Sequence, residues 1–143
     1  MVDNALGVVE RFGKEKVFYL NYAIDITYQC DCSGSSDIPF VSDIGVLSSL
    51  DPVALDQACV DLVHLYYMNP HSILVEINLL KKDEKNDWFS YIPRFNLVTK
   101  KIDLNLDGKV SSLWELQLKA AEEIGLGTRN YKLTEVYPDK NDS

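Results

Sequence analysis

The stretch IGVLSSLDPVALDQACVDLVHLYY, residues 44–67, decides the fold class. Its first six residues, Ile44 to Ser49, form a short apolar run that is typical of a β-strand. Asp51 is a good helix N-cap, and Pro52 suits the first helical position, where a missing N–H costs nothing. Apolar residues then recur at helical spacing and predict a helix that continues to about Tyr67. A strand followed by a helix is typical of α/β layer folds.

The segment KVFYLNYAIDITY, residues 16–28, predicts a strand that precedes this unit. Its β-branched and aromatic residues form a nearly continuous apolar run, which favours an interior position in a sheet covered on both faces. The residues before it carry apolar side chains at three- and four-residue steps, which predicts a helix that ends at Gly13. These positions are Val2, Ala5, Leu6, Val9 and Phe12.

The C-terminal part adds two further elements. Residues 110–124 predict a helix that ends at Gly125, and YKLTEVY, residues 131–137, predicts a final strand. We therefore expect one α/β domain over residues 1–137, with a small mixed or mostly parallel sheet flanked by two or three helices. Residues 138–143 are expected to form a disordered tail. Residues 69–110 suggest no role.

Composition excludes several classes of partner. The chain has a net charge of −8, whereas nucleic acid requires clustered Lys and Arg side chains. Anionic lipid surfaces would repel such a chain, and no apolar run reaches the roughly 20 residues of a membrane span. The N-terminal residues lack the features of a signal peptide, so we expect a cytoplasmic protein that binds neither nucleic acid nor membrane.

The loop CDCSGSSDIPFVSD, residues 30–43, holds the candidate site. Thiols and carboxylates gather there beside small residues, a pattern that indicates a metal or ligand site. The predicted metal ligands are Cys30, Asp31, Cys32, Asp37 and Asp43, and the two cysteines are also the predicted cofactor ligands. The structural alternative is that the cysteines are small packed loop residues and that the aspartates cap turns or strands through backbone amides.

The three cysteines favour free thiols or metal thiolates over a disulfide. Cys30 and Cys32 are separated by one residue, which makes a mutual disulfide awkward. Cys59 lies on the apolar side of its predicted helix and is expected in the core. His64 is expected to be an ordinary histidine, since no nucleophile–base pair can be recognised. A structural role is expected for Asp51 as a helix cap and for Asp56.

Residues 21–63 resemble the C-terminal part of the domain of unknown function 362 family, whose members are commonly described as iron–sulfur-centre proteins. Residues 120–133 look like the closing helix and strand of that family. The residues that match its C-D-C loop, D-I-G strand and D-P-V-A helix start are Cys30, Asp31, Cys32, Asp37, Pro39, Asp43, Ile44, Gly45, Asp51, Pro52, Val53, Ala54 and Asp56.

The resemblance implies a metal- or cluster-associated redox accessory module, shortened or split from a larger protein. Larger members carry an N-terminal α/β part and a ferredoxin-like insert, which this chain lacks. Its three cysteines cannot supply the four thiolates of a four-iron cluster, so the implied iron–sulfur cluster or divalent metal would be shared with a partner chain that carries the missing parts. The alternatives are a structural or interaction domain that has lost its ligand, and an enzyme that uses the aspartates.

Overall fold

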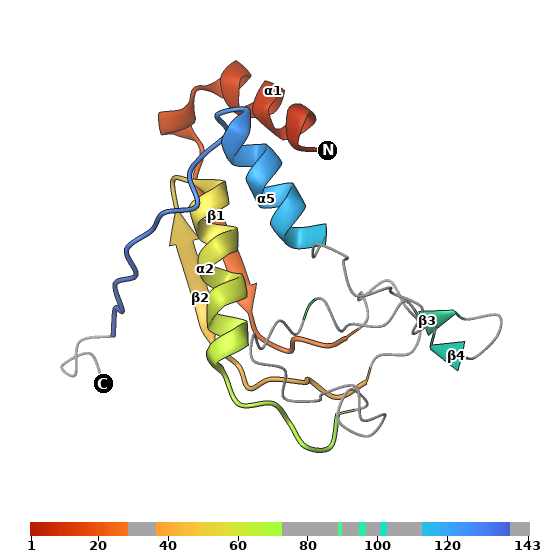
Figure 1. Ribbon diagram of the computed structural model, residues 1–143. Helices are drawn as coiled ribbons and strands as arrows, with labels where there is room; N and C mark the ends of the chain where they lie inside the picture. Colours follow the sequence, from red (N-terminus) through yellow and green to blue (C-terminus); the bar gives the residue numbers. More distant parts are fainter. Residues whose placement is uncertain (29–36, 73–88, 90–94, 97–100, 103–112, 138–143) are drawn as a thin grey trace.

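The computed structural model of the chain describes residues 1–28, 37–72, 89, 95–96, 101–102 and 113–137. Along these residues the order of elements is helix α1, 3₁₀ turn η1, strands β1 and β2, helix α2, strands β3 and β4, and helix α5 (Figure 1). Helices and strands are mixed, so the predicted α/β class is confirmed. The predicted tail, residues 138–143, lies outside the described residues.

Strands β1 (Tyr19–Ala23) and β2 (Gly45–Ser49) form an antiparallel pair. The sheet is therefore smaller than predicted, and its pairing is not parallel. The Phe40 amide donates to the carbonyl oxygen of Ile26 over 2.9 Å, so the chain returns to the end of the sheet that it left. A direct return of this kind gives antiparallel strands, whereas parallel strands require a crossover connection. The paired residues are Tyr19 and Ser49, Leu20 and Ser48, Asn21 and Leu47, Tyr22 and Val46, and Ala23 and Gly45.

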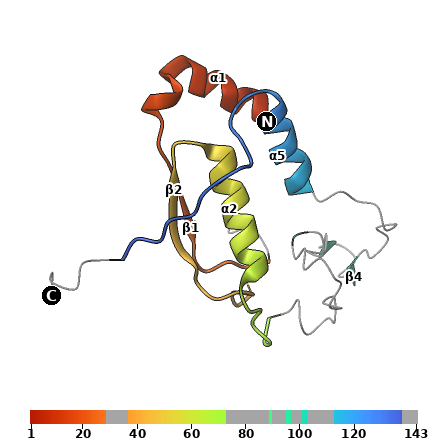
Figure 2. The ribbon, with the colours of Figure 1, turned by 60° about the vertical axis from the view of Figure 1, so that its left-hand side comes forward.

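Helix α2 (Pro52–Leu65) packs against one face of this hairpin (Figure 2). Side chains alternate across a strand, so every second residue of β1 faces the helix. The buried cluster between helix and hairpin consists of Ala23, Leu47, Leu55 and Ala58. The opposite face of β1 carries Leu20 and Tyr22, which are exposed. The prediction that this strand is covered on both faces is therefore wrong for the described structure.

Helices α1 (Val2–Phe12) and α5 (Leu113–Glu123) pack together near the N-terminal end of α2 (Figure 1). The bounds of α1 agree with the prediction. Gly13 and Gly125 follow the two helices with φ values of +94° and +78°, a conformation that favours glycine at helix ends. The buried cluster that joins the helices consists of Val9, Val53, Leu118, Ala121 and Leu126.

A further buried cluster lies at the other end of α2, where the polar loop re-enters the described structure. Phe40 and Val41 are each 1% exposed, and they pack with Val63 and Met68. Val41 and Met68 also form an isolated antiparallel bridge. This cluster fixes the backbone that carries the candidate site.

Other expectations differ in detail. Phe12 and Leu65, which belong to the apolar series of the two predicted helices, are 64% and 80% exposed rather than buried. Residues 131–137 run without strand pairing to the described residues, although a strand was predicted there.

Strands β3 (Phe95–Asn96) and β4 (Lys101–Ile102) form a short antiparallel pair. Among the described helices, none has the length and apolar character needed to cross a membrane.

Candidate functional site

A cavity of about 540 Å³ lies at the end of the β1–β2 hairpin from which the polar loop departs. We call it the loop-root pocket. Its walls come from the segment after β1, the segment before β2 and the chain that follows α2. The lining residues are Asp25, Pro39, Val41, Ser42, Asp43, Tyr67, Asn69 and Pro70.

Two acidic residues, Asp25 and Asp43, line this pocket and are joined through the Asp25 backbone. Asp25 has a φ of +49° and is the one non-glycine residue with a positive φ in the described chain. Aspartate adopts this left-handed conformation more readily than most residues. Its amide donates to Asp43 Oδ1 over 2.9 Å, which joins the end of β1 to the start of β2. Sparsely populated backbone conformations, such as that of Asp25, are common at functional sites.

Hydrogen bonds of Asn69 hold the opposite wall of the loop-root pocket in place. Asn69 N donates to the carbonyl oxygen of Phe40 over 2.7 Å, and Asn69 Nδ2 donates to that of Pro39 over 3.1 Å. The Asn69 side-chain oxygen accepts from the His71 amide over 3.0 Å. These bonds orient Asn69 and connect the re-entering loop to the chain after α2, so the pocket has a defined shape.

The predicted ligands are divided by what the structure describes. Cys30, Asp31 and Cys32 lie outside the described residues, so their part in the site stays a prediction. Asp43 lines the loop-root pocket, whereas Asp37 is half-buried and is not among its lining residues. The sequence argument missed Asp25. A signal was available, because Asp25 is the one charged residue within the apolar run after Lys16.

The described residues do not form a complete metal site. No group of three His, Cys, Asp or Glu side chains among them is arranged to hold an ion. The loop-root pocket contributes two carboxylates, and Asp43 already accepts one backbone amide. An ionised carboxylate can accept several bonds, so this contact does not exhaust its donor capacity. A coordination shell of four or more ligands would have to be completed from the loop or from another chain.

Asp51 confirms its predicted role as the N-cap of α2. Its Oδ1 accepts from the amides of Val53 and Ala54 over 2.9 and 3.0 Å. Its Oδ2 accepts from the Thr128 amide over 2.9 Å, which the sequence did not predict. A Cβ atom at Gly127 would lie 2.0 Å from Asp51 Oδ1, so only glycine allows this close approach. Asp51 therefore joins α2 to the segment after α5.

A polar network continues this contact along α2. Arg129 Nε donates to Gln57 Oε1, Gln57 Nε2 donates to Asp61 Oδ1, and the Tyr131 hydroxyl donates to Asp61 Oδ2, each over 2.8 Å. Burial and the contact with Asp61 raise the pKa of Tyr131 to about 12. Glu122 Oε1 accepts from the Arg129 amide over 2.8 Å. These hydrogen bonds attach the C-terminal segment to α2 and α5, so the charged residues of the network have a structural role.

Cys59 packs against the hairpin–helix core, as predicted. Asn21 Nδ2 donates to Asp56 Oδ1 over 2.9 Å and to Cys59 Sγ over 3.3 Å. Burial raises the pKa of the Cys59 thiol; the Asn21 bond lowers it and the Asp56 charge raises it. A thiol with a raised pKa is a poor nucleophile and a poor metal ligand at neutral pH. Cys59 therefore serves packing, whereas the exposed Asp56 holds the Asn21 side chain through a hydrogen bond.

His64 packs among aromatic rings. Its ring centroid lies 5.4 Å from that of Phe89, edge to face, and 6.0 Å from that of Trp114. These contacts agree with the expectation of an ordinary packed histidine. They join the end of α2 to the start of α5.

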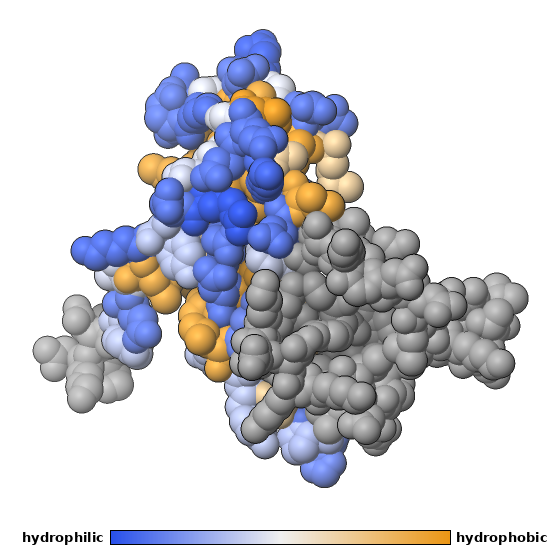
Figure 3. Space-filling view, viewed as in Figure 1, coloured by the Kyte–Doolittle hydropathy of each residue, from blue (hydrophilic) through white to orange (hydrophobic). Residues whose placement is uncertain are grey.

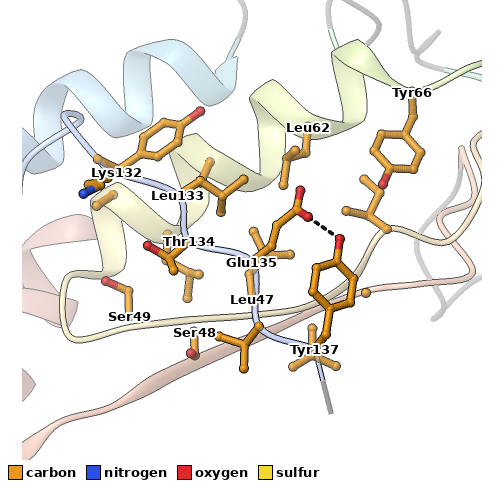
Figure 4. A pocket seen from close by; sticks show the side chains of 18 residues that line it. Leu47, Ser48, Ser49, Leu62, Tyr66, Lys132, Leu133, Thr134, Glu135 and Tyr137 are labelled. Carbon is orange, nitrogen blue, oxygen red and sulfur yellow. Dashed lines mark hydrogen bonds between the residues drawn. The ribbon is translucent and has the colours of Figure 1, made fainter. Parts of the chain in front are cut away.

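A second cavity, of about 680 Å³, lies between β2, α2 and the C-terminal segment (Figure 4). Leu47 and Leu62 line it, and so do Tyr137 and Glu135, where the Tyr137 hydroxyl donates to the Glu135 carboxylate. On the side of the molecule seen in Figure 3, the described surface is mostly hydrophilic, with separate hydrophobic patches. The charged residues that line the second cavity, Lys132 and Glu135, both come from the C-terminal segment, whereas the loop-root pocket holds two acidic residues from the end of the hairpin.

Comparison with known proteins covers the N-terminal part of the chain. Residues 1–61 match the model of a family described as a domain of unknown function (DUF362). The match contains β1, the cysteine-bearing loop, β2 and most of α2, and it supports the resemblance over those residues. It does not reach residues 120–133, where the resemblance stays a prediction. Searches of curated proteins and of solved structures found no match. The chain is thus similar to this uncharacterised family over the segment that supplies Asp25 and Asp43 to the loop-root pocket, whereas the pocket wall that follows α2 lies outside the match.

Proposed function

We propose that the chain is a metal- or cluster-associated redox accessory module whose site lies at the loop-root pocket. The observation that carries the proposal is that Asp25 and Asp43 line one pocket at the root of the loop that bears Cys30 and Cys32, with the Asp25 amide bonded to Asp43. The match of residues 1–61 to a single family model supports treating these residues as one unit.

The proposed ligands combine sulfur and oxygen donors. Cys30 and Cys32 would supply soft thiolates, and Asp31, Asp37 and Asp43 would supply harder carboxylates. Thiolates favour iron or zinc over magnesium or calcium, which prefer oxygen alone. When bound, such a group would supply electron transfer as a cluster or charge neutralisation as a divalent ion. The proposal includes a cytoplasmic location, because a reducing compartment keeps the cysteines available as thiols.

A partner chain completes the proposed site. The chain has three cysteines, and Cys59 is committed to packing, so two thiolates are available where a four-iron cluster takes four from protein. The proposed partner carries the α/β and ferredoxin-like parts that the resemblance implies. A neighbouring gene that encodes those parts, and co-purification of its product with this chain, would support the assignment.

Metal analysis of anaerobically purified protein tests the proposal. We expect substoichiometric, labile iron or zinc in the wild type and its loss in the Cys30→Ser, Cys32→Ser double variant. Cys59→Ser is the matched control, because it removes a thiol outside the loop and should leave metal content unchanged. Asp43→Asn should reduce the metal content while keeping an oxygen that can accept the Asp25 amide. Equal metal content in the wild type and the double variant would refute the proposal.

A structural or interaction domain is the second candidate. It is favoured by the use of Asp43 as a backbone acceptor and by the exposed apolar face of β1. Under this alternative the wild-type protein carries no metal above the level of the double variant. The same measurement therefore decides between the two functions.

A further inference from the structure

The outer face of the β1–β2 hairpin is an apolar surface that α2 does not cover. Leu20 and Tyr22 from β1 and Val46 from β2 lie on it, and Phe18 and Ile24 continue the same alternation beyond the ends of β1. These five side chains are between 42% and 66% exposed. We call this surface the outer face.

The outer face is continuous and uncharged. Tyr22 lies opposite Val46, and Leu20 lies opposite Ser48, so the side chains are neighbours across the two strands. No charged residue occupies an outward position between Phe18 and Ile24 or at Val46 and Ser48, although 25% of the chain is charged. Scattered exposed apolar residues are ordinary, but a continuous apolar sheet face marks an interaction surface.

We propose that the outer face binds the outer face of a second copy of this chain. Large apolar side chains with this degree of exposure offer on the order of 500 Å² per copy. Two copies would together bury on the order of 1,000 Å², which reaches the lower bound of a specific protein interface. A second copy therefore provides the area that a weak dimer needs, and it meets the surface without bringing like charges into contact.

Charges at the two ends of the hairpin orient the two copies. The turn η1 (Lys14–Lys16), with two lysines and one glutamate, precedes β1 at the end of the hairpin where Asp51 also lies, so the charges there balance. Asp25 and Asp43 lie at the opposite, acidic end. A twofold arrangement with antiparallel β1 strands keeps the two acidic ends apart, whereas a parallel arrangement would bring them together. Stacked sheets of this kind pack face to face at about 10 Å. Avoidance of like-charge contact between the acidic ends thus selects the antiparallel orientation.

Sedimentation equilibrium over protein concentrations from about 1 to about 100 µM tests the proposal, since interfaces of this size associate weakly. We expect a reversible monomer–dimer equilibrium. Val46→Glu should raise the dissociation constant at least about tenfold, because it places a charge against its symmetry mate. The matched control is Val8→Glu, on α1: Val8 is 55% exposed and Val46 is 57% exposed, and both variants add the same charge. This control should leave the dissociation constant unchanged.

Two further variants keep the test decisive. Leu20→Glu repeats the perturbation from β1, in case Val46→Glu unfolds the hairpin, and circular dichroism checks the fold of each variant. Lys16→Glu should weaken the dimer if the antiparallel orientation is correct. A wild-type chain that stays monomeric throughout the concentration range would overturn the proposal and leave the face to another occupant. Equal weakening by Val46→Glu and Val8→Glu would also overturn it.

Discussion

Asp51 offers a quantitative test of how α2 is attached to the C-terminal segment. Its Oδ1 caps the helix through Val53 and Ala54, and its Oδ2 accepts from Thr128. Loss of an N-cap costs about 1 kcal/mol of unfolding free energy. The exposed bond to Thr128 adds about 1 kcal/mol. Asp51→Ala removes both contributions and should destabilise the protein by about 2 kcal/mol.

Asp51→Asn separates the two contributions. Asparagine caps helices as well as aspartate does, so its side-chain oxygen can keep the bonds to Val53 and Ala54. Its NH₂ group cannot accept a bond from the Thr128 amide, so this variant should lose only about 1 kcal/mol. A second effect concerns Tyr19, whose pKa is raised by burial and, to a smaller extent, by the Asp51 charge. Asp51→Asn should lower the pKa of Tyr19 but leave it above its ordinary value.

Urea unfolding followed by far-ultraviolet circular dichroism measures these differences, and an unchanged slope would show that the unfolded state is the same in each variant. Asp3→Asn is the control, because it removes an aspartate from the first turn of α1 that is not the N-cap. The reasoning is refuted if Asp51→Asn is as damaging as Asp51→Ala, since the cap would then not be retained. Wild-type stability of Asp51→Asn would show that the Thr128 bond contributes nothing.

Two further predictions concern the same attachment. Gly127→Ala would place its Cβ 2.0 Å from Asp51 Oδ1 and should cost about 2 kcal/mol or more, measured by urea unfolding, because the cap must move; unchanged stability would contradict the close approach. Tyr131 has a pKa raised to about 12, so its bond to Asp61 stabilises the fold below pH 10, the ordinary tyrosine value, and this contribution is lost as the pH rises to about 12. The stability advantage of the wild type over Tyr131→Phe should therefore decrease across that interval in unfolding experiments at several pH values. An advantage that does not depend on pH would rule out this bond as its source.

Local patterns predicted the helices well and the sheet less well. The bounds of α1, the Asp51 cap and the glycines that follow α1 and α5 were all predictable, because caps and apolar periodicity are local signals. The orientation of β1 and β2 was not, since it depends on the bond between Phe40 and Ile26, which joins residues across a long loop. The predicted strand over residues 131–137 was wrong because the apolar pattern of a segment does not determine whether a partner strand lies beside it.

The candidate site, likewise, could be predicted only in part. The sequence singled out Asp43, but it did not select Asp25, whose role depends on a left-handed backbone and on an amide that points at the Asp43 carboxylate. It also assigned Asp51 to capping alone, because the partner Thr128 is distant in sequence. Residue type thus identified candidate groups, while their pairing was determined by tertiary contacts.

The hairpin explains why one segment would carry both a ligand site and an interface. A two-stranded sheet can bury one face against α2, and the apolar residues on its other face remain available to a partner. Asp25 and Asp43 lie two residues beyond the same two strands, so the pairing that orients the outer face also fixes the loop-root pocket. The C-terminal segment, by contrast, is attached to α2 through Asp51, Gln57 and Asp61. The matched residues 1–61 therefore contain the outer face and five of the eight residues that line the loop-root pocket, and the residues after α5 stabilise α2.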